Sequence, residues 1–258
     1  MALTYEVDER GEPTGWYGPR KQADLFRKIQ PVGIGIITNT ESKILKTIRA
    51  ERKLTMGGKI MYGIGEHGRA SLNDASFDKF YPYPAEDSEQ RREVRGVFYE
   101  SPRQIVARGI VEELRLQEIL GIDPDPKEAT KIIMDDLHDL KVRSVIDLSE
   151  NSRAKSARQF HYFFGFIYDP EIHGALNPTK EEFSLCEWTE INYDEIFSTL
   201  AKYLPEDYCS KTTRAIRRLE KRNISFFSIE SLEKFRRYRR HKRSYRGKSR
   251  ISKSAAAF

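Results

Sequence analysis

The residues of this chain that are best placed to do chemistry lie between Glu100 and Glu113. Arg108 and Glu112 are four positions apart, so on a helix they share one face. Glu113 points about 100° further round the same helix, and both carboxylates can reach one end of a cleft. Adjacent carboxylates repel each other unless a cation lies between them, and hard oxygen ligands favour Mg²⁺ or Mn²⁺. The pair is therefore compatible with a divalent-metal site that can bridge to a pyrophosphate, and two acids on a solvated helix face are the alternative.

The surrounding segment resembles the Nudix box, Gly-x5-Glu-x7-Arg-Glu-U-x-Glu-Glu-x-Gly-U, in which U is a bulky aliphatic residue. Residues 96–116 carry a degenerate form of it. Tyr62–Gly68 resembles the glycine-rich strand that precedes the box in many members, and Glu187 with Trp188 resembles the closing Trp–helix element. The resemblance covers residues 32–222 and implies an α/β fold, a Nudix-type α/β/α sandwich with a mixed β-sheet and a basic C-terminal extension.

The resemblance also implies an activity, the metal-dependent hydrolysis of a nucleoside diphosphate-linked substrate. In this family water attacks phosphorus while metal ions, Mg²⁺ or Mn²⁺, neutralise the developing charge. Glu112 and Glu113 are the implied catalytic residues and, with the backbone carbonyl of Gly65, the implied metal ligands. Arg108 and His67 are candidates for substrate binding, although a structural role is open for both. Glu100 is expected to be structural and to pin its loop by pairing with Arg108.

Several positions depart from the family pattern. Gly109 stands in place of the Glu that follows the Arg, and it supplies neither a metal ligand nor a base. Arg115 replaces the later Gly, Val94 stands where the first Gly is expected although Gly96 is close, and Glu66 occupies a common second Gly position upstream. A general base can also come from outside the box, for which the candidates are Asp147, Glu150, Glu181 and Glu182. The alternative is a catalytically degenerate module that senses a nucleotide or binds nucleic acid.

The elements that must position these residues follow from the hydrophobic pattern. Ser101 followed by Pro102 is a helix-start signal, and the apolar spacing continues to about Leu120. Phe160, Tyr162 and Phe164 alternate along the strongest strand and share one face, which favours core packing over base stacking. We expect strands at 32–37, 44–50, 59–64, 143–148, 159–168 and 185–188, helices at 22–29, 127–140, 194–203 and 211–222, and loops at 69–78, 80–95 and 150–157.

The charge is distributed unevenly along the chain. The net charge is +6, yet residues 234–258 hold eleven Lys and Arg and no Asp or Glu, which leaves −5 for residues 1–233. Three parts are therefore expected: an N-terminal extension (1–32), a Nudix-like domain (33–222) and a basic tail (223–258). Basic and aromatic residues alternate in the tail and suit nucleic acid, through Arg236, Arg237, Arg239, Arg240, Lys242 and Arg243.

Other readings of the tail and of the chain remain open at this stage. A solvated tail, a homo-oligomer contact or a structural role in a ribonucleoprotein or defence complex fits the same charge pattern. Gly63–Gly68 matches G-x-G-x-x-G, but no helix pattern follows, which argues against a dinucleotide fingerprint; no P-loop sequence occurs. The two cysteines are too few for a disulfide framework, and no apolar run is long enough to span a membrane. A cytoplasmic location and a nucleotide-type partner are the expectation.

Overall fold

The computed structural model describes residues 3–53, 56–71, 91–94, 97–116, 126–147, 158–173 and 176–226. It divides the chain into two units, Met1–Leu219 and Glu220–Phe258. The second unit is described only over residues 220–226, the end of one helix. The candidate site lies in the first unit.

The first unit alternates strands with helices. Its N-terminal part contains β1 (Leu3–Val7), β2 (Pro13–Pro19), α1 (Arg20–Leu25), β3 (Ile29–Asn39), β4 (Ile44–Arg49), β5 (Ile60–Met61), β6 (Ile64–His67) and β7 (Ala70–Ser71). The chain continues with β8 (Arg91–Val94), β9 (Val97–Glu100), α2 (Pro102–Leu114), α4 (Pro126–Asp136), β10 (His138–Asp147), β11 (Arg158–Tyr168), α5 (Pro170–His173), β12 (Phe183–Thr189), α6 (Tyr193–Leu200) and α7 (Glu206–Phe226).

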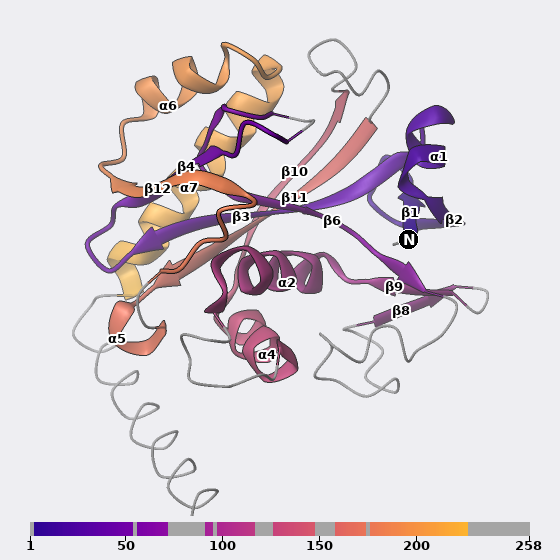
Figure 1. The fold of residues 1–258 in the computed structure, drawn as a ribbon, viewed down its shortest axis with the longest axis horizontal. Coiled ribbons are helices and arrows are strands. Elements are labelled where there is room, and N and C mark those ends of the chain that lie inside the picture. Colours follow the sequence, from indigo (N-terminus) through magenta and orange to yellow (C-terminus); the bar gives the residue numbers. More distant parts are fainter. Residues whose placement is uncertain are drawn as a thin grey trace, which may run out of the picture. The chain divides into compact units, whose positions relative to one another are not determined.

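A mixed sheet forms the centre of this unit. Its strands run in the order β10-β11-β3-β4-β12, with β5 paired to β4 and β6 paired to β3. β11 and β3 are parallel, whereas the other pairs in this sheet are antiparallel. Helices α2 and α4 lie on one face of the sheet, and α6 with the first part of α7 lies on the other (Figure 1). The α/β/α sandwich with a mixed sheet that the sequence predicts is therefore confirmed.

Each face of the sheet has its own apolar core, because successive side chains of a strand point to opposite faces. On β11, Phe160, Tyr162 and Phe164 pack in the cluster that contains α2 and α4. Phe163 packs in the cluster that contains α6 and α7. The aromatic face predicted from the alternation is thus core packing, and it is not free to stack a base.

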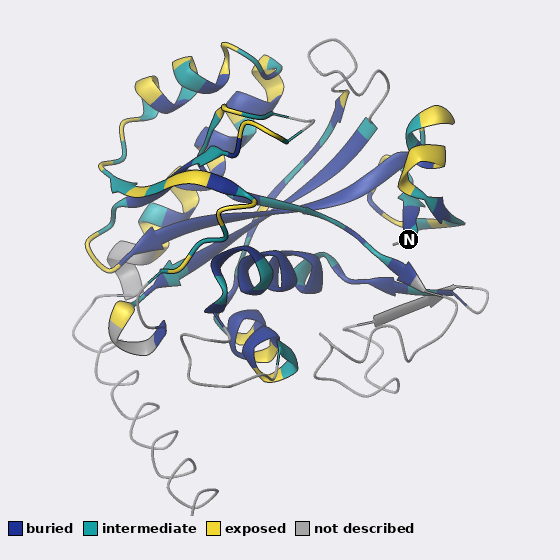
Figure 2. Cartoon of the chain, viewed as in Figure 1, coloured by how far each residue is buried: buried dark blue, intermediate teal, exposed yellow. Residues whose placement is uncertain are grey.

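Helix α2 begins where the sequence predicts and is buried along most of its length (Figure 2). The Oγ atom of Ser101 accepts from the backbone N–H of Gln104 at 3.3 Å, and Gln104 Oε1 accepts from the Ser101 N–H at 2.8 Å, which forms a capping box. The helix packs closely on β3 because Gly33 has no side chain. A Cβ at Gly33 would lie 2.5 Å from Cγ2 of Val106.

The C-terminal end of α2 comes earlier than the predicted Leu120. The helix ends at Leu114, and Arg115 adopts the left-handed conformation, with φ 51° and ψ 41°. Glycine reaches this conformation without steric cost, whereas a residue with a Cβ is strained there. This explains why the resemblance places a Gly at position 115, and it identifies a strained backbone position at the end of the candidate catalytic helix.

Residues expected to form a polar N-terminal extension are built into the fold. β1 and β2 belong to a second sheet with the order β2-β1-β7-β9-β8. Tyr5 of β1 is buried, and its hydroxyl donates to the backbone carbonyl of Glu100. The boundary expected between residues 32 and 33 falls inside β3. β1 pairs with its chain neighbour β2 over Leu3–Val7 and with β7 at Leu3.

Other element limits also need correction. The helix predicted at 127–140 ends at Asp136, and β10 begins at His138, where it pairs with Gly165 of β11. Gly65 and Glu66 lie in β6 against β3, and the strand predicted at 59–64 divides into β5 and β6. The segments 91–94 and 70–71, expected as loop, form β8 and β7. The rest of 80–95 and 69–78, and most of the turn at 150–157, lie outside the described residues.

None of the helices in the described ranges combines the length and apolar composition that crossing a membrane requires.

Replacing Arg115 by Gly is expected to stabilise the protein, because it removes the Cβ from a left-handed position. We expect Arg115→Gly to raise the free energy of unfolding by about 1 kcal/mol and Tm by about 2–4 °C. Urea unfolding and thermal unfolding measure both quantities. Arg115→Ala is the matched control, since it removes the long side chain and keeps the Cβ. An equal gain from Arg115→Ala would attribute the effect to the side chain and contradict the backbone explanation.

Candidate functional site

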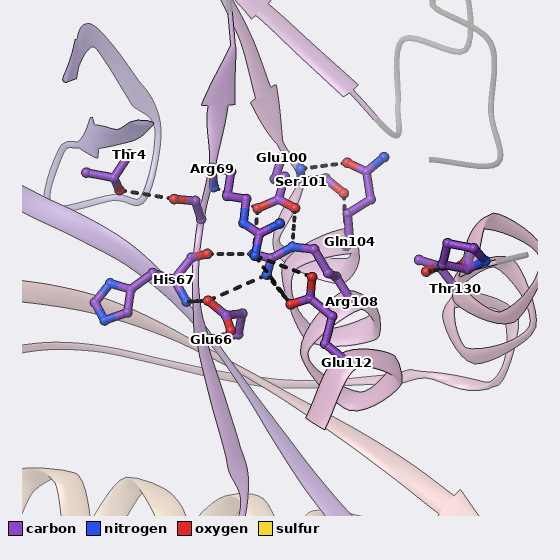
Figure 3. A network of polar contacts seen from close by, with 12 residues as sticks. Thr4, Glu66, His67, Arg69, Glu100, Ser101, Gln104, Arg108, Glu112 and Thr130 are labelled. Atoms are coloured by element: carbon purple, nitrogen blue, oxygen red, sulfur yellow. Dashed lines mark hydrogen bonds and ion pairs between the residues drawn. The ribbon is translucent and has the colours of Figure 1, made fainter. Parts of the chain in front are cut away.

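A buried ion pair between Glu100 and Arg108 joins β9 to α2. The Arg108 side chain is 0% exposed, and its Nε donates to Glu100 Oε1 at 2.7 Å while Nη2 donates to Glu100 Oε2 at 3.0 Å. Nη2 also donates to the backbone carbonyl of His67 in β6, at 2.7 Å (Figure 3). Arg108 has no exposed surface to offer a substrate, so the structure does not support the substrate-binding role expected for it. Glu100 occupies the pinning position that the sequence suggested.

Glu112 is held by two arginines. Its Oε2 accepts from Arg108 Nη1 at 3.0 Å, and both carboxylate oxygens accept from Arg69 Nη2, at 3.3 and 3.4 Å. The side chain is partly exposed, at 27%. Two guanidinium groups therefore neutralise this carboxylate and fix its direction.

Glu113 lies in a different electrostatic environment from its neighbour. It is only 8% exposed, and within the described residues its carboxylate has no hydrogen bond or ion pair. Burial raises its pKa well above 4.5, and the charges of Glu66 and Glu182 raise it further, against smaller opposing effects of Arg49 and Lys53. A buried carboxylate of this kind is stabilised either by a proton or by a cation.

Glu66 is brought to the same place by β6. Its Oε1 accepts from the backbone N–H of His67 at 2.8 Å and lies 3.5 Å from Arg108 Nη1. The Cβ of Glu66 packs against Gly109, and a Cβ added at position 109 would lie 2.8 Å from it. Sequence reasoning treated Glu66 only as a departure from the family pattern. The signal that could have found it is its pairing with Gly109: a carboxylate is present where glycine is common, and glycine is present where a carboxylate is common.

Glu182 also approaches Glu113, from the turn that precedes β12. It pairs with Arg49 Nη2 at 3.5 Å and with Lys53 Nζ. The backbone N–H of Thr179 in the same turn donates to the Glu113 carbonyl at 2.9 Å, which holds the turn against the end of α2. Of the candidate bases, Glu182 alone is shown near this cluster among the described residues.

The remaining candidate bases lie elsewhere. Asp147 pairs with Arg27 Nη2 at 2.7 Å. In the strand register it lies opposite Arg158, which lies opposite Ile29 at the beginning of β3. Glu181 is exposed. Glu150 lies outside the described residues, as do the nucleic-acid-binding candidates Arg236, Arg237, Arg239, Arg240, Lys242 and Arg243.

His67 does not join the carboxylates. Ile64 and Glu66 of β6 both approach Gly109, so Gly65 and His67 point to the opposite face of the sheet. In Figure 3 the imidazole points away from Arg108 and Glu112. Burial lowers its pKa well below 6.5, with further lowering by Arg20, and the neutral ring carries no charge to attract a phosphate. The substrate contact expected for His67 is therefore not supported, whereas its backbone carbonyl helps to hold Arg108.

A divalent cation fits the chemistry of this group, although the geometry is not preassembled. No three His, Cys, Asp or Glu side chains in the described ranges are already gathered as a metal site. The donors are nevertheless carboxylate oxygens, which Mg²⁺ and Mn²⁺ prefer, and Glu113 is buried with no ionic partner among the described residues. The backbone carbonyl of Gly65 was expected to be a metal ligand. Gly65 directly precedes Glu66 in β6 and pairs with Ile34 of β3.

Comparison with known proteins gives likenesses of fold. No protein-family model matches this chain, and no curated protein matches it. Among solved structures it is similar to the DR0079 protein of Deinococcus radiodurans, at 11% identity and a TM-score of 0.46, over 81% of this chain and 98% of that one. It is also similar to a MutT protein of Methanosarcina mazei Go1, at 15% identity and a TM-score of 0.40, over 76% and 95% of the two chains.

A further likeness is to a NUDIX hydrolase of Alicyclobacillus acidocaldarius, at 16% identity and a TM-score of 0.38, over 69% of this chain and 86% of that one. At this level of similarity no activity carries over to this chain.

Breaking the Glu100–Arg108 pair is expected to be strongly destabilising, because one buried charge loses its partner. Arg108→Met keeps much of the side-chain volume and should lower the free energy of unfolding by about 3–5 kcal/mol. Urea unfolding measures the change. The control is Asp147→Asn in the exposed pair with Arg27, which should cost no more than about 1 kcal/mol. A loss of similar size in the two variants would contradict the special role of the buried pair.

The raised pKa of Glu113 predicts a pH dependence of stability. The unfolded chain releases this proton near pH 4.5, whereas the metal-free folded chain keeps it to a higher pH. Stability is therefore lost as the pH rises from 4.5 towards the raised pKa. Glu113→Gln cannot ionise, so its stability relative to the wild type should increase over that interval and then level off.

Urea unfolding in EDTA, between about pH 4 and pH 8, measures this difference. The control is Glu190→Gln, at a side chain that is 81% exposed, which should follow the wild type. A pH-independent difference between Glu113→Gln and the wild type would show that the carboxyl is not held protonated by its surroundings.

Proposed function

We propose that this protein is a divalent-metal-dependent hydrolase that cleaves a diphosphate linkage in a nucleotide-type substrate. The observation that carries the proposal is Glu113: a carboxylate nine-tenths buried, close to Glu66 and Glu182, with no ionic partner of its own among the described residues. Such a group favours a cation, and Mg²⁺ or Mn²⁺ when bound would neutralise the charge that develops on a diphosphate.

The residues around Glu113 have separable roles in this proposal. Glu113 supplies oxygens to the cation. Glu112, with its direction fixed by Arg69 and Arg108, presents a partly exposed carboxylate at the same end of α2. Glu182 is the candidate general base, because among the described candidates it is the one whose charge acts on Glu113, and it is partly exposed.

The basic side chains near Glu182 suit an anionic substrate. Arg49 and Lys53 pair with Glu182 and are each partly exposed, at 26% and 27% of the side chain. A diphosphate that approached Arg49 and Lys53 would meet two positively charged side chains. The nucleotide part of the substrate is inferred from the resemblance to the Nudix box, and the base that it carries stays open.

Turnover should require both the cation and Glu113. Purified protein would be assayed for phosphorus-containing products against nucleoside diphosphate sugars, dinucleoside polyphosphates, nucleoside triphosphates and capped RNA, with Mg²⁺ and then Mn²⁺. Glu113→Gln should lower kcat by about a hundredfold or more, comparable with the loss of one preorganised charge-stabilising group. Glu190→Gln should retain wild-type rates.

Two results would overturn the proposal. Turnover that persists in EDTA or in Glu113→Gln would reject the metal dependence and the role of Glu113. The other is no turnover of any compound, with thermal stabilisation by one of them, which would identify the nucleotide-sensing module as the function instead.

A further inference from the structure

Gly109 and Glu66 fit together as a complementary pair. Gly109 lies three residues before Glu112 and four before Glu113, so a side chain at position 109 would share a face of α2 with both carboxylates. That space is already filled. A Cβ at Gly109 would lie 2.8 Å from the Cβ of Glu66, closer than real Cβ atoms approach, and 3.5 Å from its Cγ, an ordinary contact. The strand therefore occupies the volume that a helix side chain would otherwise take.

The carboxylate of Glu66 lies beside the part of α2 that carries Arg108 and Glu112. Its Oε1 and the Oε2 of Glu112 both lie within 3.5 Å of one atom, Nη1 of Arg108. The contact from Arg108 to Glu66 is 3.5 Å, longer than its contacts to Glu100 and Glu112, at 2.7 and 3.0 Å. Of these three carboxylates, Glu66 therefore has the weakest contact with Arg108.

A second observation indicates that a cation belongs here. Glu113 is 8% exposed and has no hydrogen bond or ion pair in the described part of the chain, although Glu66 and Glu182 lie near enough to repel it. Glu182 is compensated by Arg49 and Lys53. Within this cluster, Glu113 and Glu66 are the two carboxylates whose negative charge is least balanced by basic side chains.

We propose that Glu66 takes the place of the carboxylate that is absent from position 109, and that its oxygens join those of Glu113 as ligands of the divalent cation. This assignment rests on the proposed function and deepens it. It makes Gly109 the residue that admits the ligand and removes the need for a metal-binding side chain at that position of the helix. If Glu66 only helped to hold Arg108, replacing it would leave the metal affinity unchanged.

The test is a carboxylate exchange between strand and helix. Isothermal titration of EDTA-treated protein with Mn²⁺ alone measures affinity for the wild type, Glu66→Gln, Glu66→Gly, Gly109→Glu and the double variant Glu66→Gly with Gly109→Glu. Glu66→Gln keeps the size of the side chain and the acceptor for the His67 N–H, so it is the matched control for folding. Both Glu66 variants should weaken Mn²⁺ binding by about tenfold or more. The double variant should recover binding to within about threefold of the wild type, because the glycine at 66 makes room for the glutamate at 109.

The outcomes are distinguishable. Full Mn²⁺ affinity in Glu66→Gln and Glu66→Gly, together with lost affinity in Glu113→Gln, would overturn the assignment of Glu66 and leave the proposed function intact. A double variant no better than Glu66→Gly, with circular dichroism showing both folded, would overturn the replacement of position 109. Absence of Mn²⁺ binding by the wild type, or binding unaffected by Glu113→Gln, would overturn the assignment and the proposed metal site together.

Discussion

The buried guanidinium of Arg108 is the interaction on which the geometry of the site depends. An arginine presents five N–H donors in a planar fork, and here the fork joins Glu100 at the end of β9, the His67 carbonyl in β6 and Glu112 on its own helix. A lysine would supply a point charge without this geometry and could not hold the three elements in one orientation. Because the Arg108 charge is fully buried, losing any one of these partners would cost stability. The position of α2 against β6 is therefore strongly specified.

This constraint gives two adjacent glutamates unlike surroundings. Glu112 shares the face of Arg108 and is neutralised by it and by Arg69. Glu113 points about 100° away, into the space between α2, β6 and the turn before β12, where Glu66 and Glu182 are its near carboxylates. Burial there disfavours the ionised form, and folding without a cation therefore carries an electrostatic penalty at neutral pH. No basic side chain among the described residues pairs directly with Glu113, and an added cation would offset this penalty. That arrangement is consistent with a cation-binding function.

The sequence predicted those parts of the fold whose signals are local. Ser101 with Pro102 specified the start of α2, and the alternation of Phe160, Tyr162 and Phe164 specified a core strand. It failed for short strands with a weak apolar pattern: β7 has two residues and β8 reads RREV, although β8 pairs with its chain neighbour β9. It also missed the start of β10, whose first residues pair with Gly165 and Phe164 of β11. The proximity of Glu182 to Glu113 likewise needs the turn held by Thr179, and no spacing along the chain indicates it.

The departures at positions 66 and 109 are harder to interpret one by one than together. A glycine inside a helix lowers stability by about 1 kcal/mol relative to alanine, and a half-buried glutamate with a long ion pair adds little to offset it. Considered singly, each looks like decay of a catalytic helix. In contact, however, the glycine is what allows the glutamate to lie against the helix, since any side chain at 109 would collide with it. The number of carboxylates around the end of α2 is therefore kept, and one of them is moved to β6. A strand carboxylate has its backbone fixed by pairing with β3, so the relocation changes which element orients the oxygen without leaving that oxygen less constrained.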